Sequence, residues 1–211
     1  MALVYPLPMT TLASLSFSEL LDQVAAKTPS PGGGAVACAS AALAAALAHM
    51  VVAYSLGKKT LAQHQPELER ASEALQRLRS IVIELGEEDA QAYSLVNELS
   101  KLPETDARRR TDLPAAIQAS IQIPMAAIAA CDDLLRLCEK LAPITNVHLH
   151  SDLAIAAVLA ESGARASRWN VLVNVALLPD IAQRERTLAE ADRSLADASR
   201  RREIVEKLCR H

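Results

Sequence analysis

One carboxylate in a helical stretch of this chain, Asp89, is a candidate for catalysis. Asp89 follows Glu87 and Glu88, and charge clusters of this kind usually form solvated helix faces, which we expect for the two glutamates. Asp89 itself lies four residues after Leu85 and four before Tyr93, so it can share their side of the helix and face inward. A carboxylate that faces a pocket can hold a cationic centre or act as a base.

The segment PSPGGG at residues 29–34 is the most specific local motif, and it leads straight into an apolar helix. Consecutive glycines expose backbone N–H groups, and a helix start adds partial positive charge, so an anion or a carbonyl group can bind there. Alternatively, the glycines only allow tight packing of a helix pair, and the motif alone leaves both interpretations open. A Walker loop is excluded because no GK[ST] follows, and no preceding strand supports a Rossmann fold. The candidate binding residues of this motif are Ser30, Gly32, Gly33 and Gly34.

Two lysines close the same apolar run. Lys58 and Lys59 follow Gly57, at the end of a helix where the dipole favours cations. Ordinary capping explains this placement. The functional alternative is a pair of cations that binds a carboxylate-bearing ligand.

The stretch 146–152 has a polar residue at every second position: Asn146, His148, His150 and Asp152. In an extended loop these side chains share one side, which is compatible with metal ligation by two histidines and a carboxylate. No third distant ligand is evident, so we expect no metal. Asp152 can instead cap the helix that follows.

Two amides interrupt a later apolar helix. Asn170 and Asn174 are one turn apart, and Arg165 lies about a turn earlier. Buried amides are costly unless they are hydrogen-bonded, so they are expected to face a ligand or an internal polar network. The sequence leaves both possibilities open.

The elements that must position these residues begin with an uncharged helix. No charged residue occurs from Thr28 to Gly57, a run long enough to cross a membrane. Its interior is dominated by alanine, which contributes little to membrane insertion, and it also carries Ser40 and His49. Small residues at helical spacing let a second backbone approach closely, so we expect a buried central helix or a helix at a subunit interface.

Composition limits the classes of partner and compartment. The 211 residues carry 22 basic and 25 acidic side chains, which gives no footprint for a nucleic acid. The four cysteines form no CxxC pair and no secretory leader is recognised at the N-terminus, so we expect a cytoplasmic protein.

No segment alternates with the period of a strand, and helical patterns follow one another without an obvious linker. Residues 1–211 are therefore expected to form one all-α domain of about seven helices around the alanine-rich helix. Ser16 and Glu19 form a capping box that starts a short helix. A long helix from Pro66 is expected to bend at Gly86, and Pro124 is expected to kink or divide a later helix.

These fragments together resemble the cyclodeaminase domain of formiminotransferase-cyclodeaminases and the related methenyltetrahydrofolate cyclohydrolases. The motifs occur in the family's order over nearly the whole chain: TPSPGGGAV (28–36), GKK (57–59), EDAQAY (88–93), LPET (102–105), AIQ (116–118), IP (123–124), SDLAIAA (151–157) and NVLVN (170–174). The chain departs from the family at Thr145–His148, where a Gly-Asn-x-Asn run is usual, and His150 and Ala126 are also unusual.

The resemblance implies an all-α homodimer that acts on a reduced folate without a metal. Formimidoyltetrahydrofolate cyclodeaminase and methenyltetrahydrofolate cyclohydrolase activities are both expected from it, because each passes through a tetrahedral carbon between two nitrogens. No formiminotransferase segment is recognised in the chain, which favours the cyclohydrolase at least equally. The altered 145–150 loop leaves a third hypothesis, a folate-binding or dimerisation module that has lost catalysis.

The resemblance also implies roles for the candidate residues. Asp89 and Asp152 are the candidate catalytic carboxylates, and Lys59 is the candidate proton donor to ammonia. The expected folate-binding residues are Ser30, Gly32, Gly33, Gly34, Lys58, Asn146, Ser151, Arg165, Asn170 and Asn174. Because a helix of 20 residues is about 30 Å long, the glycines and the lysines are expected to serve different sites, each completed by a partner chain.

Overall fold

The chain folds into helices because alanine, leucine and long charged residues favour them, while most glycines and prolines fall near helix ends or in connections. The computed structural model describes residues 11–210, and no strand occurs among them. The six α-helices are α1 Phe17–Ala25, α2 Gly33–Ala53, α3 Gln65–Ser100, α4 Ala107–Leu141, α5 His150–Val175 and α6 Ile181–Leu208. Four short 3-10 helices are η1 Leu12–Ser14, η2 Lys59–His64, η3 Ala142–Ile144 and η4 Val147–Leu149.

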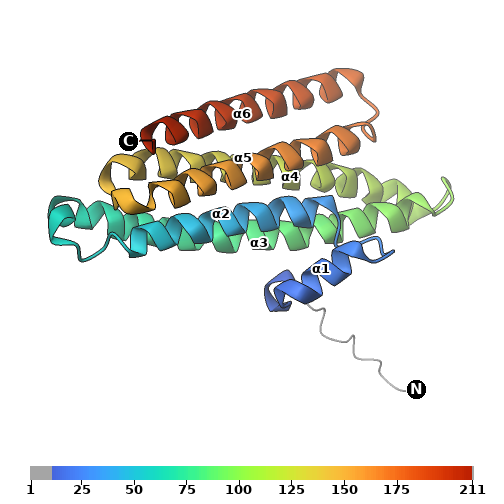
Figure 1. Ribbon diagram of the computed structural model, residues 1–211. Helices are drawn as coiled ribbons and strands as arrows, with labels where there is room; N and C mark the ends of the chain where they lie inside the picture. The colour runs from blue at the N-terminus through green and yellow to red at the C-terminus, as the bar shows by residue number, and fades with distance from the viewer. Residues whose placement is uncertain (1–10, 211) are drawn as a thin grey trace.

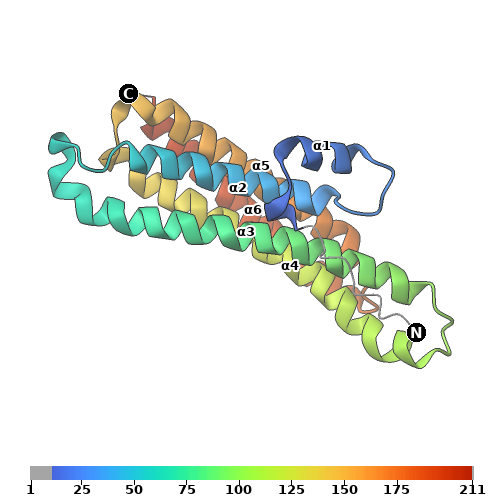
Figure 2. The ribbon, with the colours of Figure 1, turned by 90° about the horizontal axis from the view of Figure 1, so that it is seen from below.

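Five of the helices form an elongated bundle with α2 inside it. α2 packs against α3 on one side and α5 on the other, and α4 contacts both of those neighbours. α6 covers α4 and α5 along one edge of the bundle, and α1 crosses the opposite edge over α2 (Figures 1 and 2). The predicted all-α fold is confirmed, and one side of the alanine-rich helix α2 is buried against its neighbours while Val36 and Leu43 are exposed on the other.

Small side chains explain how α2 fits between its neighbours. The face of α2 that carries Ala37, Ala41, Ala44 and Ala48 is fully buried. On α5, a Cβ at Gly163 would lie 3.1 Å from the carbonyl oxygen of Ala37, so a larger residue would push the two helices slightly apart. Alanine and glycine therefore set the spacing between α2 and α5.

The capping box predicted at the first helix is confirmed. Ser16 accepts from the backbone N–H of Glu19, whose carboxylate accepts from the Ser16 backbone N–H at 2.7 Å, which completes the capping box. Gly57, in contrast, does not cap α2: the helix ends at Ala53 with Tyr54 as its C-cap, and Gly57 adopts a left-handed φ of 74° in the turn that follows.

Other local predictions are wrong. α4 runs through Pro114 and Pro124 without a break, so the bundle has six α-helices among residues 11–210 and not about seven. α3 also runs unbroken through Gly86, which is buried, so the bend predicted there does not divide the helix. The helix after the 142–149 connection starts at His150, so Asp152 lies in its first turn and is not its cap.

Two helices pass a test of length and composition for membrane crossing, at Gly33–Ala53 and Ala107–Ile144. Half of the apolar window in the first and 39% of the window in the second are buried inside the bundle. A core helix surrounded by other helices passes the same test.

Candidate functional site

A cavity of about 260 Å³ lies at the N-terminal end of α2. Four segments meet there: the loop before α2 with its first turn, the middle of α3, the middle of α4 and the last turns of α5. The lining residues are Pro29, Ser30, Gly32, Gly33, Gly34, Asp89, Ala90, Tyr93, Ser120, Asn170, Val173 and Asn174. The structure thus brings the glycine motif, Asp89 and both amides together, although they come from three distant parts of the sequence.

The Asp89 carboxylate lies directly against the first turn of α2. A Cβ added to Gly34 would overlap with that carboxylate, so a side chain at Gly34 would displace it. Within residues 11–210, Asp89 has no ion-pair partner. Burial raises the pKa of Asp89 above its ordinary value, because a desolvated carboxylate resists ionisation. An unneutralised, partly desolvated carboxylate is suited to a cationic ligand.

Close packing between α2 and α3 holds Asp89 in this position. One turn before Asp89, a Cβ at Gly86 would lie 3.1 Å from the Cβ of Cys38 and 3.0 Å from Cδ1 of Leu12. Gly86 therefore lets α3 approach α2, and the interior glycine that suggested a bend serves packing instead. Cys38 beside it has its pKa raised to about 12, by burial first and by the charge of Asp89 second, and so stays a neutral thiol.

The amides of α5 form the other wall of the cavity. Oδ1 of Asn170 would lie 3.6 Å from a Cβ at Gly33, so this amide sits beside the glycine motif in ordinary contact. Nδ2 of Asn174 donates to the backbone carbonyl of Ser120 in α4 at 2.6 Å. One amide thus contacts the loop side of the cavity, and the other is joined to α4.

The remaining predicted residues are at other places in the bundle. Lys58 and Lys59 follow α2 at its far end, and Asn146, Ser151 and Asp152 lie around the start of α5. The two segments meet, because Ser55 accepts from the backbone N–H of Asn146 at 2.9 Å. α2 has 21 residues, so this second group is about 30 Å from the glycine motif within one chain.

Arg165, in α5, belongs to neither of these two groups of residues. Its guanidinium pairs with Glu161 one turn earlier and lies 3.5 Å from the hydroxyl of Ser199 on α6. It is not among the residues that line the cavity.

The cavity also contains residues that sequence reasoning missed. Ser120, Tyr93 and Val173 line it, and none of them is among the predicted site residues. Ser120 had a readable signal, because it lies four residues before Pro124, a proline that leaves its carbonyl without a helical donor.

Metal ligation has no support in the described part of the chain. Residues 11–210 contain no group of three or more His, Cys, Asp or Glu side chains that could hold a metal ion. His150, one of the alternating polar residues, is buried, and neither of its ring nitrogens has a hydrogen-bond partner.

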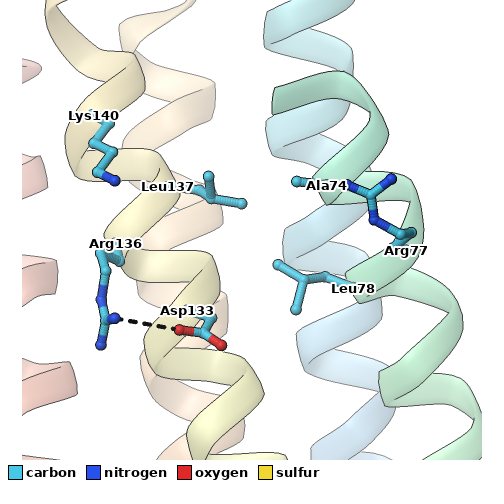
Figure 3. Close-up of a pocket in the computed structure, with 7 residues that line it drawn as sticks. All are labelled: Ala74, Arg77, Leu78, Asp133, Arg136, Leu137 and Lys140. Carbon is cyan, nitrogen blue, oxygen red and sulfur yellow. Dashed lines mark ion pairs between the residues drawn. The ribbon is translucent and has the colours of Figure 1, made fainter. Parts of the chain in front are cut away.

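Other cavities on the bundle are larger, and two of them are compared with this one. One of about 300 Å³ lies between α3 and α4, where Leu78 and Leu137 point toward each other and Arg136 pairs with Asp133 at 3.6 Å (Figure 3). It includes none of the predicted site residues. The other, about 610 Å³, adjoins the α2 cavity and shares Ser30 and Ala90 with it.

Comparison with known proteins agrees with the resemblance seen in the motifs. The model of the formiminotransferase-cyclodeaminase family matches residues 16–193. A methenyltetrahydrofolate cyclohydrolase from Methylorubrum extorquens is 32% identical over 187 residues, which cover 87% of this chain and 90% of that protein.

Two further similar proteins carry the cyclodeaminase name. A formimidoyltransferase-cyclodeaminase of Mus musculus is 28% identical over 202 residues, which are 94% of this chain but 37% of the mouse protein. Among solved structures, formiminotetrahydrofolate cyclodeaminase from Thermotoga maritima matches with a TM-score of 0.86 and 32% identity, over 93% of this chain and 96% of that one.

Proposed function

Because this chain belongs to the formiminotransferase-cyclodeaminase family, we propose that it is a folate-dependent enzyme acting on the C–N bonds of 5-formimino- or 5,10-methenyl-tetrahydrofolate. The observation that carries the proposal is the Asp89 carboxylate, desolvated and without an ion-pair partner in residues 11–210, in one cavity with the glycine motif and two amides. The one-carbon unit of both substrates is a delocalised cation when protonated or cyclised, and it matches this carboxylate in charge.

Both reactions need a group that stabilises this cation and moves a proton. In the deaminase reaction N10 attacks the formimino carbon, the new N10–C bond forms, and the bond to the departing nitrogen breaks to release ammonia. In the hydrolase reaction water adds to the methenyl carbon, its proton passes to a base, and the N5–C bond breaks to leave a 10-formyl group. Asp89 serves as electrostatic partner of the cation and as that base.

The other residues of the cavity bind the rest of the folate. Backbone N–H groups at Gly32, Gly33 and Gly34 and the hydroxyl of Ser30 are donors at the start of α2. Asn170 and Asn174 pair with the polar edge of the pterin, whose donors and acceptors an amide can match.

A homodimer is the assembly we propose, with its interface on α2 and α5. The outward sides of these neighbouring helices expose several apolar side chains; α5 also exposes Arg165 there, whereas α2 carries no charged side chain at all. Their exposed large side chains are Val36 and Leu43 of α2 and Ile155, Val158, Trp169 and Val173 of α5. Val173 also lines the α2 cavity, so a second copy on this face would reach the site.

Two-fold pairing on this face accounts for the residues at the far end of α2. If the two α2 helices run antiparallel across the axis, the glycine motif of one protomer faces Lys58, Lys59 and Asp152 of the partner subunit. Lys58 then binds the glutamate tail, Lys59 protonates departing ammonia, and Asn146 and Ser151 complete the rim. Arg165 is proposed to contact the tail from the same face of α5.

Mixed dimers test whether the site is shared. Asp89→Asn and Asp152→Asn variants are each expected to be inactive. After subunit exchange, half of the dimers are mixed and each has one intact site of two, so about a quarter of wild-type activity returns. Absence of any recovery, with exchange verified by mass spectrometry, places all catalytic groups within one subunit.

Turnover of methenyl-tetrahydrofolate tests the role of Asp89. Asp89→Asn is expected to lower kcat about 10²–10⁴-fold, the range for loss of a general base. The matched control is Glu88→Gln, which removes an exposed neighbouring carboxylate and should leave kcat unchanged. Equal rates in Asp89→Asn and wild type would contradict the assignment.

One pair of assays separates the two activities. Ammonia release from 5-formimino-tetrahydrofolate reports the deaminase, and loss of methenyl absorbance reports the hydrolase. The similarity to a cyclohydrolase over 90% of its length and to a cyclodeaminase structure over 96% of its length supports both readings equally.

A catalytically degenerate module is the second candidate, and the altered 145–150 loop favours it. This loop includes buried His150, whose ring nitrogens are unpaired. Calorimetric titration with a folate analogue distinguishes a scaffold, which does not bind at millimolar concentration, from a binding protein.

A cytoplasmic location is proposed on separate grounds, since all four cysteines are free thiols.

A further inference from the structure

A proline inside a long helix leaves free a backbone carbonyl that one residue of the candidate site binds. Pro124 is buried in the middle of α4, where proline has no N–H to donate. In a regular helix the residue at 124 would donate to the carbonyl four positions earlier, which belongs to Ser120. Ser120 is itself buried, so its carbonyl must find another donor or lose the free energy of a hydrogen bond.

The missing donor comes from another helix. Nδ2 of Asn174 in α5 donates to the Ser120 carbonyl at 2.6 Å. The hydroxyl of Ser120 does not compete, because it donates to the carbonyl of Ile117 at 2.8 Å. The bond therefore joins two residues that line the cavity, and the carbonyl that accepts it is free because of Pro124, which does not line the cavity.

A carbonyl only accepts hydrogen bonds, and this fixes the orientation of the amide. Asn174 must present its nitrogen to Ser120, and the other half of the amide is an oxygen. Among residues 11–210, no donor to this Oδ1 is found. Asn174 therefore offers the cavity an acceptor.

We propose that Pro124 is a positioning residue of the site: by withholding an N–H from the Ser120 carbonyl, it anchors Nδ2 of Asn174 and turns Oδ1 toward the substrate. The identity of the donor rests on the proposed function: Oδ1 accepts from an N–H of the reduced pterin, which carries several ring and exocyclic N–H donors. Pro124 itself touches no substrate.

A second proline in the same helix provides the contrast. Pro114 is also inside α4, and the carbonyl that it leaves without a donor belongs to Arg110. Both residues are exposed, so water can satisfy this carbonyl, and no side-chain donor to it occurs in the described residues. Pro114→Ala is therefore the matched control for Pro124→Ala.

The first experiment is a double-mutant cycle read by thermal unfolding, which needs no substrate. In the wild type, Asn174→Ala leaves the Ser120 carbonyl unpaired and should lower Tm by several degrees. In Pro124→Ala, the backbone N–H of residue 124 takes over that carbonyl, so Asn174→Ala should change Tm by less than half as much. In Pro114→Ala, the full decrease should remain. Equal decreases in all three backgrounds would overturn the proposal.

The second experiment reads the consequence for substrate. Pro124→Ala should raise KM for methenyl-tetrahydrofolate roughly tenfold with kcat within threefold, since one binding hydrogen bond is lost. Its Tm should not fall, because alanine is a better helix former than proline. Unchanged KM would overturn the part played by Oδ1. A chain inactive toward every folate would refute the proposed function and leave the unfolding cycle as the test of Pro124.

Discussion

At the scale of single residues, Asp89 combines a catalytic position with a cost to stability. Its carboxylate is partly desolvated against the first turn of α2, and burial raises its pKa. Below the unfolded pKa of 3.8, Asp89 is protonated in both the folded and the unfolded protein and carries no cost to stability. Because its pKa is raised in the folded protein, the stability contributed by the protonated form is lost as the pH rises through the folded pKa. At neutral pH the ionised carboxylate therefore destabilises the fold.

Asp89→Asn should consequently be more stable than the wild type at pH 7. Each kcal/mol recovered is expected to raise Tm by about 2–4 °C in a protein of this size. The difference should shrink as the pH is lowered and vanish below the unfolded pKa, where both proteins carry a neutral group. Thermal unfolding between pH 7 and about pH 3 measures this, with Glu88→Gln as the exposed control. A less stable Asp89→Asn at pH 7 would mean that the ionised carboxylate is held by favourable contacts.

At the scale of elements, the sequence predicted what local rules decide. The capping box at Ser16 and the apolar helix between residues 33 and 53 both depend on neighbouring residues, and both are confirmed. The inward direction of Asp89 followed from helical periodicity in the same way.

Predictions that depend on distant partners failed. Pro124 does not divide α4, because its lost hydrogen bond is replaced by Asn174 from fifty residues further on. The Gly86 position accommodates Cys38 and Leu12, which are far away in the chain. The sequence shows that Asn174 is a polar residue in an apolar helix. Its role as a donor becomes visible only when the structure places the Ser120 carbonyl beside it.

Gly163 is the element-scale test of how α5 is held against α2. In Gly163→Ala the new Cβ would lie 3.1 Å from the Ala37 carbonyl and 3.2 Å from Sγ of Cys131, and a backbone oxygen cannot move without shifting a helix. Overpacking of this kind costs about 1–3 kcal/mol. Replacing glycine by alanine inside a helix gains about 1 kcal/mol, so we expect a net loss of stability when the overpacking cost is in the upper part of its range. Denaturant unfolding should show the loss.

Gly33→Ala is the control for this substitution. It adds the same methyl group to a helix, but its nearest contact is 3.6 Å, an ordinary van der Waals distance. Its free energy of unfolding should be unchanged or slightly higher. A Gly163→Ala variant as stable as Gly33→Ala would show that α5 can move away from α2 at no cost.

At the scale of the whole molecule, the two groups of candidate residues are separated by the length of α2. One chain places Asp89 and the glycine motif at one end of this helix and the lysines and Asp152 at the other. A symmetric pair on the apolar α2–α5 face accounts for both groups with one kind of site, and it covers apolar side chains that a single chain leaves exposed.

A charge on that face should therefore abolish dimer and activity together. Val158 is 41% exposed near the middle of α5, so Val158→Glu should leave the helical bundle folded while the buried charge opposes pairing. We expect a monomer by analytical ultracentrifugation, an unchanged helical circular dichroism spectrum, and loss of turnover because each site lacks its partner residues. Ala196→Glu on the exposed side of α6 is the control and should stay dimeric and active. A monomeric Val158→Glu with full activity would show that the lysines and Asp152 at the far end of α2 have no part in the reaction.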